Sequence, residues 1–240
     1  MTTLMNFPTS SEHILSSGNT TIGIIPELSL VSHFQVGSWQ VLYRPEETGN
    51  VKRWGMPLMI PNFSRLKNGI FKEKDTLLPI HGFGRSLPWT VIEQDSSRIS
   101  IQLMSDAEIR YNYPYDFIFT AAMVAGEEML TYTLTMENYS DEVMPIAPGF
   151  HPYFAVAQQD KAKLAIDGPP GFDISAFQWD TNPPDNPYPF PHRVTVRFPV
   201  VVLLLLLNCQ ASTGIRLPIC KFSASQHQRP ITSLCVLSQQ

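Results

Sequence analysis

The sequence predicts an all-β protein, built as one large antiparallel β-sandwich, and three features of its 240 residues favour this class. Charged residues make up only 16% of the chain, whereas it holds 21 prolines and 14 phenylalanines, a composition that favours strands and ordered loops over long exposed helices. Apolar and polar residues alternate in several short segments between turn residues. The length suits one domain, because a single β-sandwich can reach about 200–250 residues.

The clearest strand pattern lies in the middle of the chain. Residues 117–124 form one apolar run of strand-favouring residues, and Ala-Gly-Glu-Glu then supplies a turn. In residues 129–136, leucine, tyrosine and methionine alternate with threonine, which is the period-two pattern of a half-buried strand. The two runs predict an antiparallel hairpin whose threonine face meets water or a polar cleft.

Shorter segments complete the predicted sandwich. We expect strand structure at residues 34–43, where Gly37 interrupts it, and strands at residues 99–104 and 194–198. We also expect a buried strand at residues 200–207, an apolar run far too short to span a membrane. Residues 167–192 are rich in proline and aromatic residues, and an irregular segment of that length is often functional.

The two ends of the chain differ in texture from its middle. Residues 1–20 are polar and rich in serine and threonine, so we expect a flexible N-terminal tail followed by one domain over residues 21–240. Residues 200–240 are atypical, because no Asp or Glu follows Asp185 and strand periodicity fades. The final strands of the sandwich are therefore expected to be altered or missing.

Charge and cysteine content narrow the functional class. The net charge of −4 argues against nucleic acid as a partner, which requires a basic surface. The N-terminus lacks a basic segment followed by an apolar one, so we expect no signal peptide and a cytoplasmic protein with no membrane partner. Three cysteines without paired spacing predict reduced thiols: Cys209, Cys220 and Cys235.

A group of basic residues precedes the first histidine motif, and one further basic residue lies within it. Seven cations lie close together in the sequence, and they are equally compatible with a local anion site and with a solvated loop region. They are Lys52, Arg53, Arg65, Lys67, Lys72, Lys74 and Arg85.

Two short motifs carry the residues suited to chemistry, HGFGRSLPW from His81 to Trp89 and PGFHPYF around His151. A histidine titrates near neutral pH and can lend and recover a proton. Arg85 can grip a hydroxyl or a phosphate, while Trp89 and Tyr153 offer flat faces to a sugar ring. Residue types alone also allow both histidines to be satisfied core residues, and no third ligand has metal-site spacing.

These motifs resemble the aldose 1-epimerase family, in particular its branch of hexose-6-phosphate mutarotases. HGFGRSLPW is similar to the family segment HGF-A-R-x-x-x-W, and ENYSDEVMPIAPGFHPYF resembles the stretch that ends in G-x-H-P-Y-F. The resemblance covers roughly residues 20–200. It implies a galactose mutarotase-like supersandwich with a sugar cleft on one sheet face. It also implies interconversion of the α and β anomers of a hexose or hexose 6-phosphate, without metal or organic cofactor.

The resemblance assigns roles to individual residues. By position, His151 matches the acid that protonates the ring oxygen, whereas His81 and Arg85 match substrate-contacting positions. Trp89, Tyr153 and Asp180, the last in the proline-rich segment, are further candidates for substrate binding.

One element of the family pattern is missing. The catalytic glutamate of the family lies late in the chain, typically in a V-x-E-P-W context, whereas here Leu237 occupies a comparable apolar segment and cannot accept a proton. Other carboxylates are conceivable substitutes: Glu127, Glu128, Asp180 and Asp185. Three interpretations therefore stay open: a mutarotase, a non-catalytic carbohydrate-binding member, and an inert chain with a damaged C-terminus.

Overall fold

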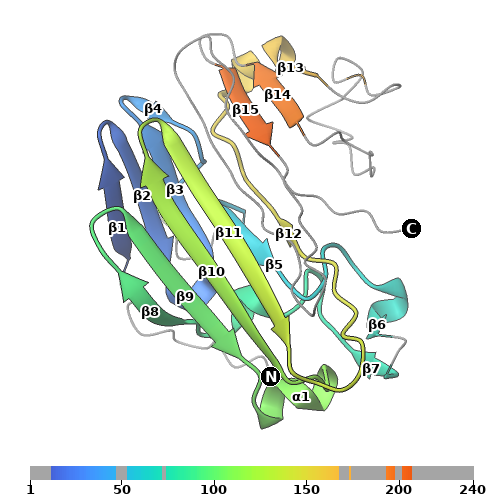
Figure 1. Ribbon diagram of the computed structural model, residues 1–240. Helices are drawn as coiled ribbons and strands as arrows, with labels where there is room; N and C mark the ends of the chain where they lie inside the picture. The colour runs from blue at the N-terminus through green and yellow to red at the C-terminus, as the bar shows by residue number, and fades with distance from the viewer. Residues whose placement is uncertain are drawn as a thin grey trace.

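The computed structural model describes residues 12–46, 53–71, 74–167, 173, 193–197 and 202–206, and it confirms the all-β class (Figure 1). Two antiparallel sheets carry most of the strands. The part of the chain that is described has one α-helix, α1 (Ala107–Asn112), and no helix there is long and apolar enough to cross a membrane.

The first sheet has six strands and contains the N-terminal part of the chain. Its order is β1-β2-β3-β5-β12, with β4 paired to β3. The strands are β1 (His13–Ser17), β2 (Thr20–Ile25), β3 (Leu30–Val36), β4 (Trp39–Gln40), β5 (Met56–Met59) and β12 (Gly149–Phe150). Because β1 begins at His13, strand structure starts inside the segment that was expected to be a tail.

The sequence pattern at residues 34–43 indicated strand structure interrupted by Gly37, and the structure divides the segment at that residue. β3 ends at Val36, and Gly37 then adopts a φ of 56°, a left-handed conformation that glycine reaches without strain. The Gly37 amide donates to Asn19 O at 2.8 Å, and β4 turns back to pair with β3. The interruption at Gly37 that the sequence pattern indicated is therefore confirmed.

The second sheet has the order β11-β10-β9-β8. Its strands are β8 (Thr90–Gln94), β9 (Arg98–Met104), β10 (Phe117–Gly126) and β11 (Met129–Asn138). The predicted hairpin is confirmed, because β10 and β11 pair continuously from Phe117↔Asn138 to Gly126↔Met129. Buried residues alternate with half-buried ones along most of β11, as the sequence pattern predicted, and the same alternation occurs along β10.

The remaining strands and turns are short. β6 (Ile70–Phe71) pairs with β7 (Thr76–Leu77), and β13 (Ala165–Ile166), β14 (Arg193–Arg197) and β15 (Val202–Leu206) form a third sheet. The 3-10 turns are η1 (Pro26–Leu28), η2 (Lys67–Gly69), η3 (Gly84–Ser86) and η4 (Gln158–Lys163). β14 and β15 confirm the two late strands, while the cysteines and most of residues 167–192 lie outside the described residues.

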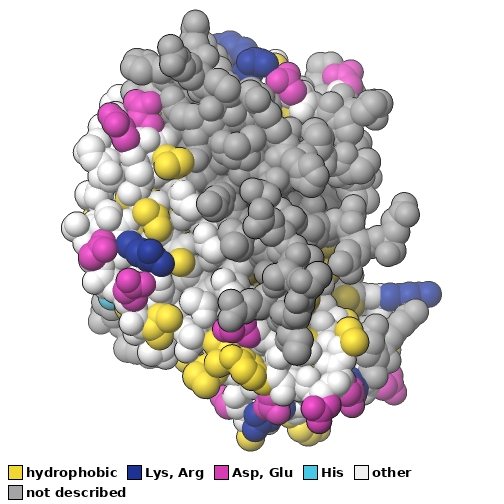
Figure 2. Space-filling view, viewed as in Figure 1, with side chains coloured by type: hydrophobic (Ala, Val, Ile, Leu, Met, Phe, Trp, Pro, Cys, Tyr) yellow, Lys and Arg dark blue, Asp and Glu magenta, His cyan; other side chains and the backbone are white. Residues whose placement is uncertain are grey.

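The main core lies between the two large sheets. β10 contacts β1 and β2 across the sandwich, and the facing side chains are almost completely buried. They include Ile22 and Leu58 from the first sheet and Phe119 and Leu134 from the second. Each such burial contributes about 1.5–3 kcal/mol through the hydrophobic effect. On the face shown in Figure 2, side chains of both charge signs are interspersed with apolar ones.

Candidate functional site

The two histidine motifs meet at β5, although they are far apart in the sequence. β12 pairs with β5 through Phe150↔Leu58, and the His151 amide continues this ladder by donating to Pro57 O at 3.1 Å. On the other side, the amides of Phe83 and Gly84 donate to Ile60 O at 2.9 and 3.0 Å. β5 and Ile60, the residue that follows it, therefore hold both motifs through backbone hydrogen bonds.

A glycine in the first motif makes this approach possible. Gly82 has a φ of 68°, and a Cβ atom built on it would lie 2.1 Å from Ile60 O. Neither the backbone conformation nor the space admits another residue without displacement. The Gly in His-Gly-Phe-Gly is thus required by the close contact between this turn and the end of β5.

The ring of His151 lies between two other rings. Its centroid is 4.6 Å from that of Tyr153, with the planes 19° apart, and 5.4 Å from that of His81, with the planes 82° apart. Phe150 points into the core, where its ring packs 4.6 Å from that of Tyr132. Since strand side chains alternate, His151 faces away from the core, and it is half-buried.

His81 is fixed by its own backbone and by Ser64. It has a φ of 66°, its Nδ1 accepts a hydrogen bond from the Ser64 amide at 3.0 Å, and its own amide donates to Ser64 O at 2.9 Å. Because Nδ1 is an acceptor, the neutral ring carries its proton on Nε2. His81 is therefore arranged as a hydrogen-bond donor through Nε2.

The rings of His81, His151 and Tyr153 form one cluster, called the ring cluster below. Two arginines influence its tyrosine. Burial raises the pKa of the Tyr153 hydroxyl, and the positive charges of Arg53 and Arg85 oppose that shift. Both positive charges therefore act on the Tyr153 hydroxyl, and the phenol is neutral at physiological pH. Arg53 is exposed and Arg85 is half-buried, with an Nη2 that donates to Ile80 O at 3.4 Å. The edge of the ring cluster is a place where an anion is favoured.

Comparison with known proteins agrees with this arrangement. The family model described as Aldose 1-epimerase matches residues 65–200, more than half of the chain and including both histidine motifs. The chain belongs to the aldose 1-epimerase family. The family model ends at residue 200, inside the segment 186–240 in which no Asp or Glu occurs.

Two curated relatives come from enterobacteria, and both are named as candidate glucose-6-phosphate 1-epimerases. The protein of Escherichia coli (strain K12) is 28% identical over 148 residues, which cover 58% of this chain and 45% of the relative. The protein of Salmonella typhimurium is 30% identical over the same shares. The chain thus spans somewhat less than half the length of the curated relatives it matches.

Solved structures show the same fold. A galactose mutarotase related enzyme from Lactobacillus acidophilus superimposes with a TM-score of 0.63 at 18% identity, over 87% of this chain and 84% of that one. The Slr1438 protein from Synechocystis sp. PCC 6803 gives a TM-score of 0.65 at 20% identity, over 93% and 90%. The galactose mutarotase-like architecture implied by the sequence motifs is confirmed.

Not every predicted residue of this aldose 1-epimerase family member joins the ring cluster. Trp89 is only 4% exposed, and its Nε1 donates to Gly84 O at 2.8 Å, an oxygen that also accepts from Ser29 Oγ at 2.9 Å. This indole supports the turn that carries Arg85 and has no open face for a sugar ring. Asp180 lies outside the described residues.

The alternative carboxylates are placed elsewhere or are not described. Glu127 and Glu128 lie at the β10–β11 turn, where Glu127 approaches Gly18 and Glu128 Oε1 is 3.5 Å from Asn19 Nδ2. They therefore belong to the β1–β2 end of the sandwich, whereas Asp185 is outside the described residues. Among the residues that are described, no group of three or more His, Cys, Asp or Glu side chains is arranged to hold a metal ion.

An apolar hollow of about 360 Å³ lies next to the segment that carries Ser64. Its walls come from residues around β6, β7 and the chain before β12, and none of the three clustered rings lines it: Pro61, Asn62, Leu66, Lys67, Ile70, Phe71, Leu78, Pro145, Ile146 and Ala147. We place the functional site at the rings rather than in this hollow, because proton transfer needs titratable groups and the hollow offers only one, Lys67.

Sequence reasoning missed two residues of the site. Arg53 was one of seven cations without a role, because only the fold reveals that its charge acts on the Tyr153 hydroxyl. Ser64 orients His81 through its backbone amide, and a backbone donor leaves no signal in the residue type. Of the seven cations, Lys52 and Lys72 lie outside the described residues.

Proposed function

We propose that this protein interconverts the α and β anomers of a hexose phosphate, with His151 as the acid of ring opening. The observation that carries the proposal is the half-buried imidazole of His151, held between the rings of Tyr153 and His81 beside two arginines. A pyranose that approaches these rings would meet a proton donor, a neutral phenol and a cationic edge at the same time.

His151 suits the acid role by chemistry and by position. Ring opening requires a proton at the ring oxygen as the bond between that oxygen and the anomeric carbon breaks, and a proton must leave the anomeric hydroxyl. An imidazole that titrates near pH 7 can donate that proton and take it back on ring closure. Stacking against Tyr153 limits rotation of the ring, so the donor nitrogen is held in one direction.

His81 and Tyr153 suit binding rather than proton transfer. Nδ1 of His81 accepts from the Ser64 amide, so the neutral ring carries its proton on Nε2, which suits a hydrogen bond to a sugar hydroxyl. The phenol of Tyr153 stays neutral, since burial raises its pKa, and can therefore donate to a hydroxyl as well. Together they would fix which face of the sugar is presented to His151.

Arg53 and Arg85 support a phosphorylated substrate. A guanidinium matches the geometry of a phosphate and can donate two parallel hydrogen bonds to it. Two such groups bind a phosphate far more strongly than a neutral hydroxymethyl group. The printed names of the curated relatives point the same way, because both concern glucose 6-phosphate.

A second function is favoured by one specific feature. Residues 186–240 contain no Asp or Glu, so the chain lacks the late carboxylate that would take the proton from the anomeric hydroxyl. Loss of a general base typically lowers the rate by about 10²–10⁴-fold, and water would then have to accept the proton. A protein that keeps the sugar site without useful turnover would be a carbohydrate-phosphate binding member of the family.

An assay coupled to a dehydrogenase specific for β-glucose 6-phosphate, started from the α anomer, separates the two functions. The proposal predicts a lag that shortens in proportion to added protein. Titration calorimetry with glucose 6-phosphate supplies the second measurement. Binding without any shortening of the lag would establish the binding function, and absence of both would reject the site altogether.

A further inference from the structure

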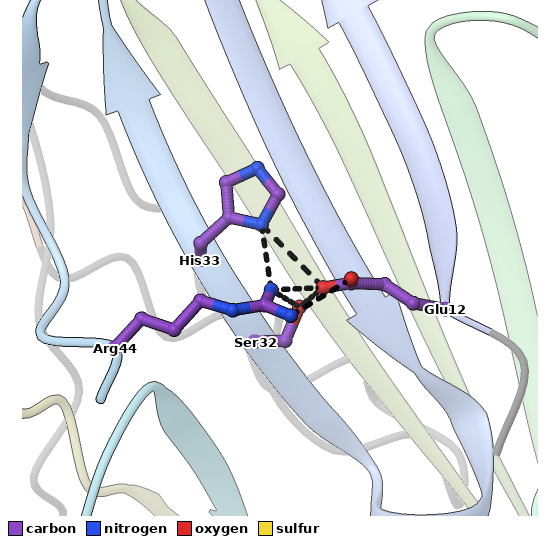
Figure 3. A network of polar contacts seen from close by, with 4 residues as sticks. All are labelled: Glu12, Ser32, His33 and Arg44. Atoms are coloured by element: carbon purple, nitrogen blue, oxygen red, sulfur yellow. Dashed lines mark hydrogen bonds and ion pairs between the residues drawn. The ribbon is translucent and has the colours of Figure 1, made fainter. Parts of the chain in front are cut away.

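A compact ionic network of Glu12, Ser32, His33 and Arg44 lies on the first sheet (Figure 3). Arg44 forms a two-point ion pair with Glu12, in which Nη2 donates to Oε2 at 3.0 Å and Nη1 donates to Oε1. Ser32 Oγ also donates to Glu12 Oε1, and Arg44 Nη1 is 3.1 Å from His33 Nδ1. Ser32 and His33 lie on β3, Arg44 follows β4, and Glu12 directly precedes β1, so the network ties Glu12 to the sheet.

This network is a built feature of the fold rather than a chance surface contact. Gly23 faces it, and a Cβ atom there would lie 2.4 Å from both Glu12 Oε1 and Ser32 Oγ. Burial raises the pKa of the Glu12 carboxyl, but hydrogen bonds from Arg44 and Ser32 and the charge of Arg44 outweigh it, so the pKa is below its ordinary value. Burial also lowers the pKa of His33, which leaves that ring neutral and able to accept from Arg44.

The network continues toward the proposed phosphate site through Trp54. The guanidinium carbon of Arg44 lies 5.8 Å from the centroid of the Trp54 ring, a cation–π distance. Trp54 is 8% exposed and packs in a second apolar cluster with Ile25 and Leu30. The backbone is joined at the same place, since the Gly55 amide donates to Tyr43 O at 2.8 Å.

Arg53 depends on this arrangement because it is the residue next to Trp54. Its side chain is exposed, so its direction is set mainly by where the backbone of residues 53–55 is held. That backbone is held by the buried indole, by the contact of Arg44 with the indole, and by the bond from Gly55 to Tyr43. The Gly55 carbonyl in turn accepts from the Tyr153 amide at 2.9 Å, which places the same segment beside the ring cluster.

We propose that Glu12 and Arg44 are positioning residues that hold Trp54, and thereby Arg53, in place for the phosphate of the substrate. The inference rests on the proposed function, because it assigns the network to the affinity of that same site. It predicts that loss of the Glu12–Arg44 ion pair, called the clamp below, lowers the affinity for the phosphate and leaves the proton-transfer step at His151 intact.

The test compares Glu12→Gln and Arg44→Gln with Arg110→Gln in the full-length protein. Arg110 forms an ion pair with Asp116 at 2.5 Å beside α1, so its variant also loses one ion pair but not this clamp. For each variant we would measure KM and kcat for glucose 6-phosphate and the inhibition constant of inorganic phosphate. Thermal unfolding identifies the temperature range in which every variant is folded.

We expect KM and the phosphate inhibition constant to rise together by about fivefold in both clamp variants, with kcat within about twofold of the unmodified protein. The double variant should be no worse than either single one, since both changes break the same contact. Arg110→Gln should leave all three constants unchanged. A general loss of structural integrity would lower kcat as well and would not act selectively on phosphate.

Arg44→Lys is the second variant, because lysine keeps a cation over Trp54 but cannot make the two-point contact with Glu12. It should fall between the unmodified protein and Arg44→Gln. Constants that stay within twofold in the clamp variants, or a fall in kcat at constant KM, would overturn the inference while the proposed function stands. An unmodified protein that neither turns over nor binds glucose 6-phosphate would reject both.

Discussion

In the β10–β11 hairpin the strands pair without interruption from Phe117 to Asn138, and alternate side chains enter the core. The ring cluster is built from the opposite kind of backbone, with Ser64, His81 and Gly82 all at positive φ and short segments that attach to β5. The hairpin is stabilised by burial that many residues share. The cluster depends on a few contacts that cannot be exchanged, so the two regions should respond differently to substitution.

The largest expected effect on stability lies in the hairpin. Phe119 is fully buried, and its ring stacks 3.9 Å from that of Phe117. Phe119→Ala should lower the free energy of unfolding by about 3–5 kcal/mol, measured by urea titration, because it removes a large buried ring and leaves a cavity. Thr133→Ala, on the half-exposed face of the same hairpin, should cost about 1 kcal/mol or less. Equal losses at the two positions would contradict the assignment of the core face.

Glycine substitution sharpens the comparison at the cluster. Gly82→Ala should lower the free energy of unfolding by about 2–3 kcal/mol and reduce affinity for sugar phosphate, because it combines a positive φ with contact against Ile60 O. Gly18→Ala is the matched control, since it has a φ of 55° but its nearest neighbour would be Glu127 Cγ at 3.8 Å. Differential scanning calorimetry of both variants separates strain from contact. A Gly82 variant no less stable than the Gly18 variant would show that the contact carries no weight.

The arginine at the edge of the cluster should control affinity. Arg85→Gln should raise KM for glucose 6-phosphate about tenfold or more, the value expected for a lost charge-assisted hydrogen bond, and should affect free glucose less. Arg98→Gln, which removes an exposed partner of Glu93 on the second sheet, serves as control in the same coupled assay. Equal losses for phosphorylated and free sugar would argue against a phosphate contact at Arg85.

The smallest effect concerns acid stability. Because the folded-state pKa of Glu12 lies below its ordinary value, its ion pair stabilises the fold above the unfolded pKa, about 4.3, and this contribution is lost as the pH falls through the lower, folded-state value. Glu12→Gln should therefore be less stable at neutral pH and show a shallower loss of stability below about pH 4.3. Chemical denaturation at several pH values would reveal it. A constant difference across that range would mean that Glu12 is not ionised in the folded protein.

The regular part of the molecule was predictable because its signal is local. Alternation in residues 99–104 and 129–136 records which side chains enter the core, so β9 and the hairpin were expected with nearly correct limits. The break at Gly37 was visible in the sequence, but a glycine permits a turn without requiring one, so the pairing of β4 with β3 was not. β1 was hidden because its short polar segment becomes a strand only by pairing with β2.

The site was only partly predictable, because its residues come together through contacts between segments that are distant in the sequence. The histidine motifs identified His81 and His151, but the sequence could not show that both would attach to β5 and meet at 5.4 Å. Trp89 was expected to face the sugar, yet an indole suits a buried position equally well when its Nε1 finds a carbonyl. Arg53 was not singled out, because its proximity to Tyr153 follows from strand pairing rather than from spacing.

The central claim is that the His151 ring gives a proton to a sugar, and magnetisation transfer between the α and β anomeric signals of glucose 6-phosphate tests it most directly. The unmodified protein should raise the exchange rate above that of the buffer in proportion to its concentration. His151→Ala should return it to the buffer rate, a loss of about 10²-fold or more, while its thermal transition stays close to that of the unmodified protein. Exchange in His151→Ala as fast as in the unmodified protein would contradict the account.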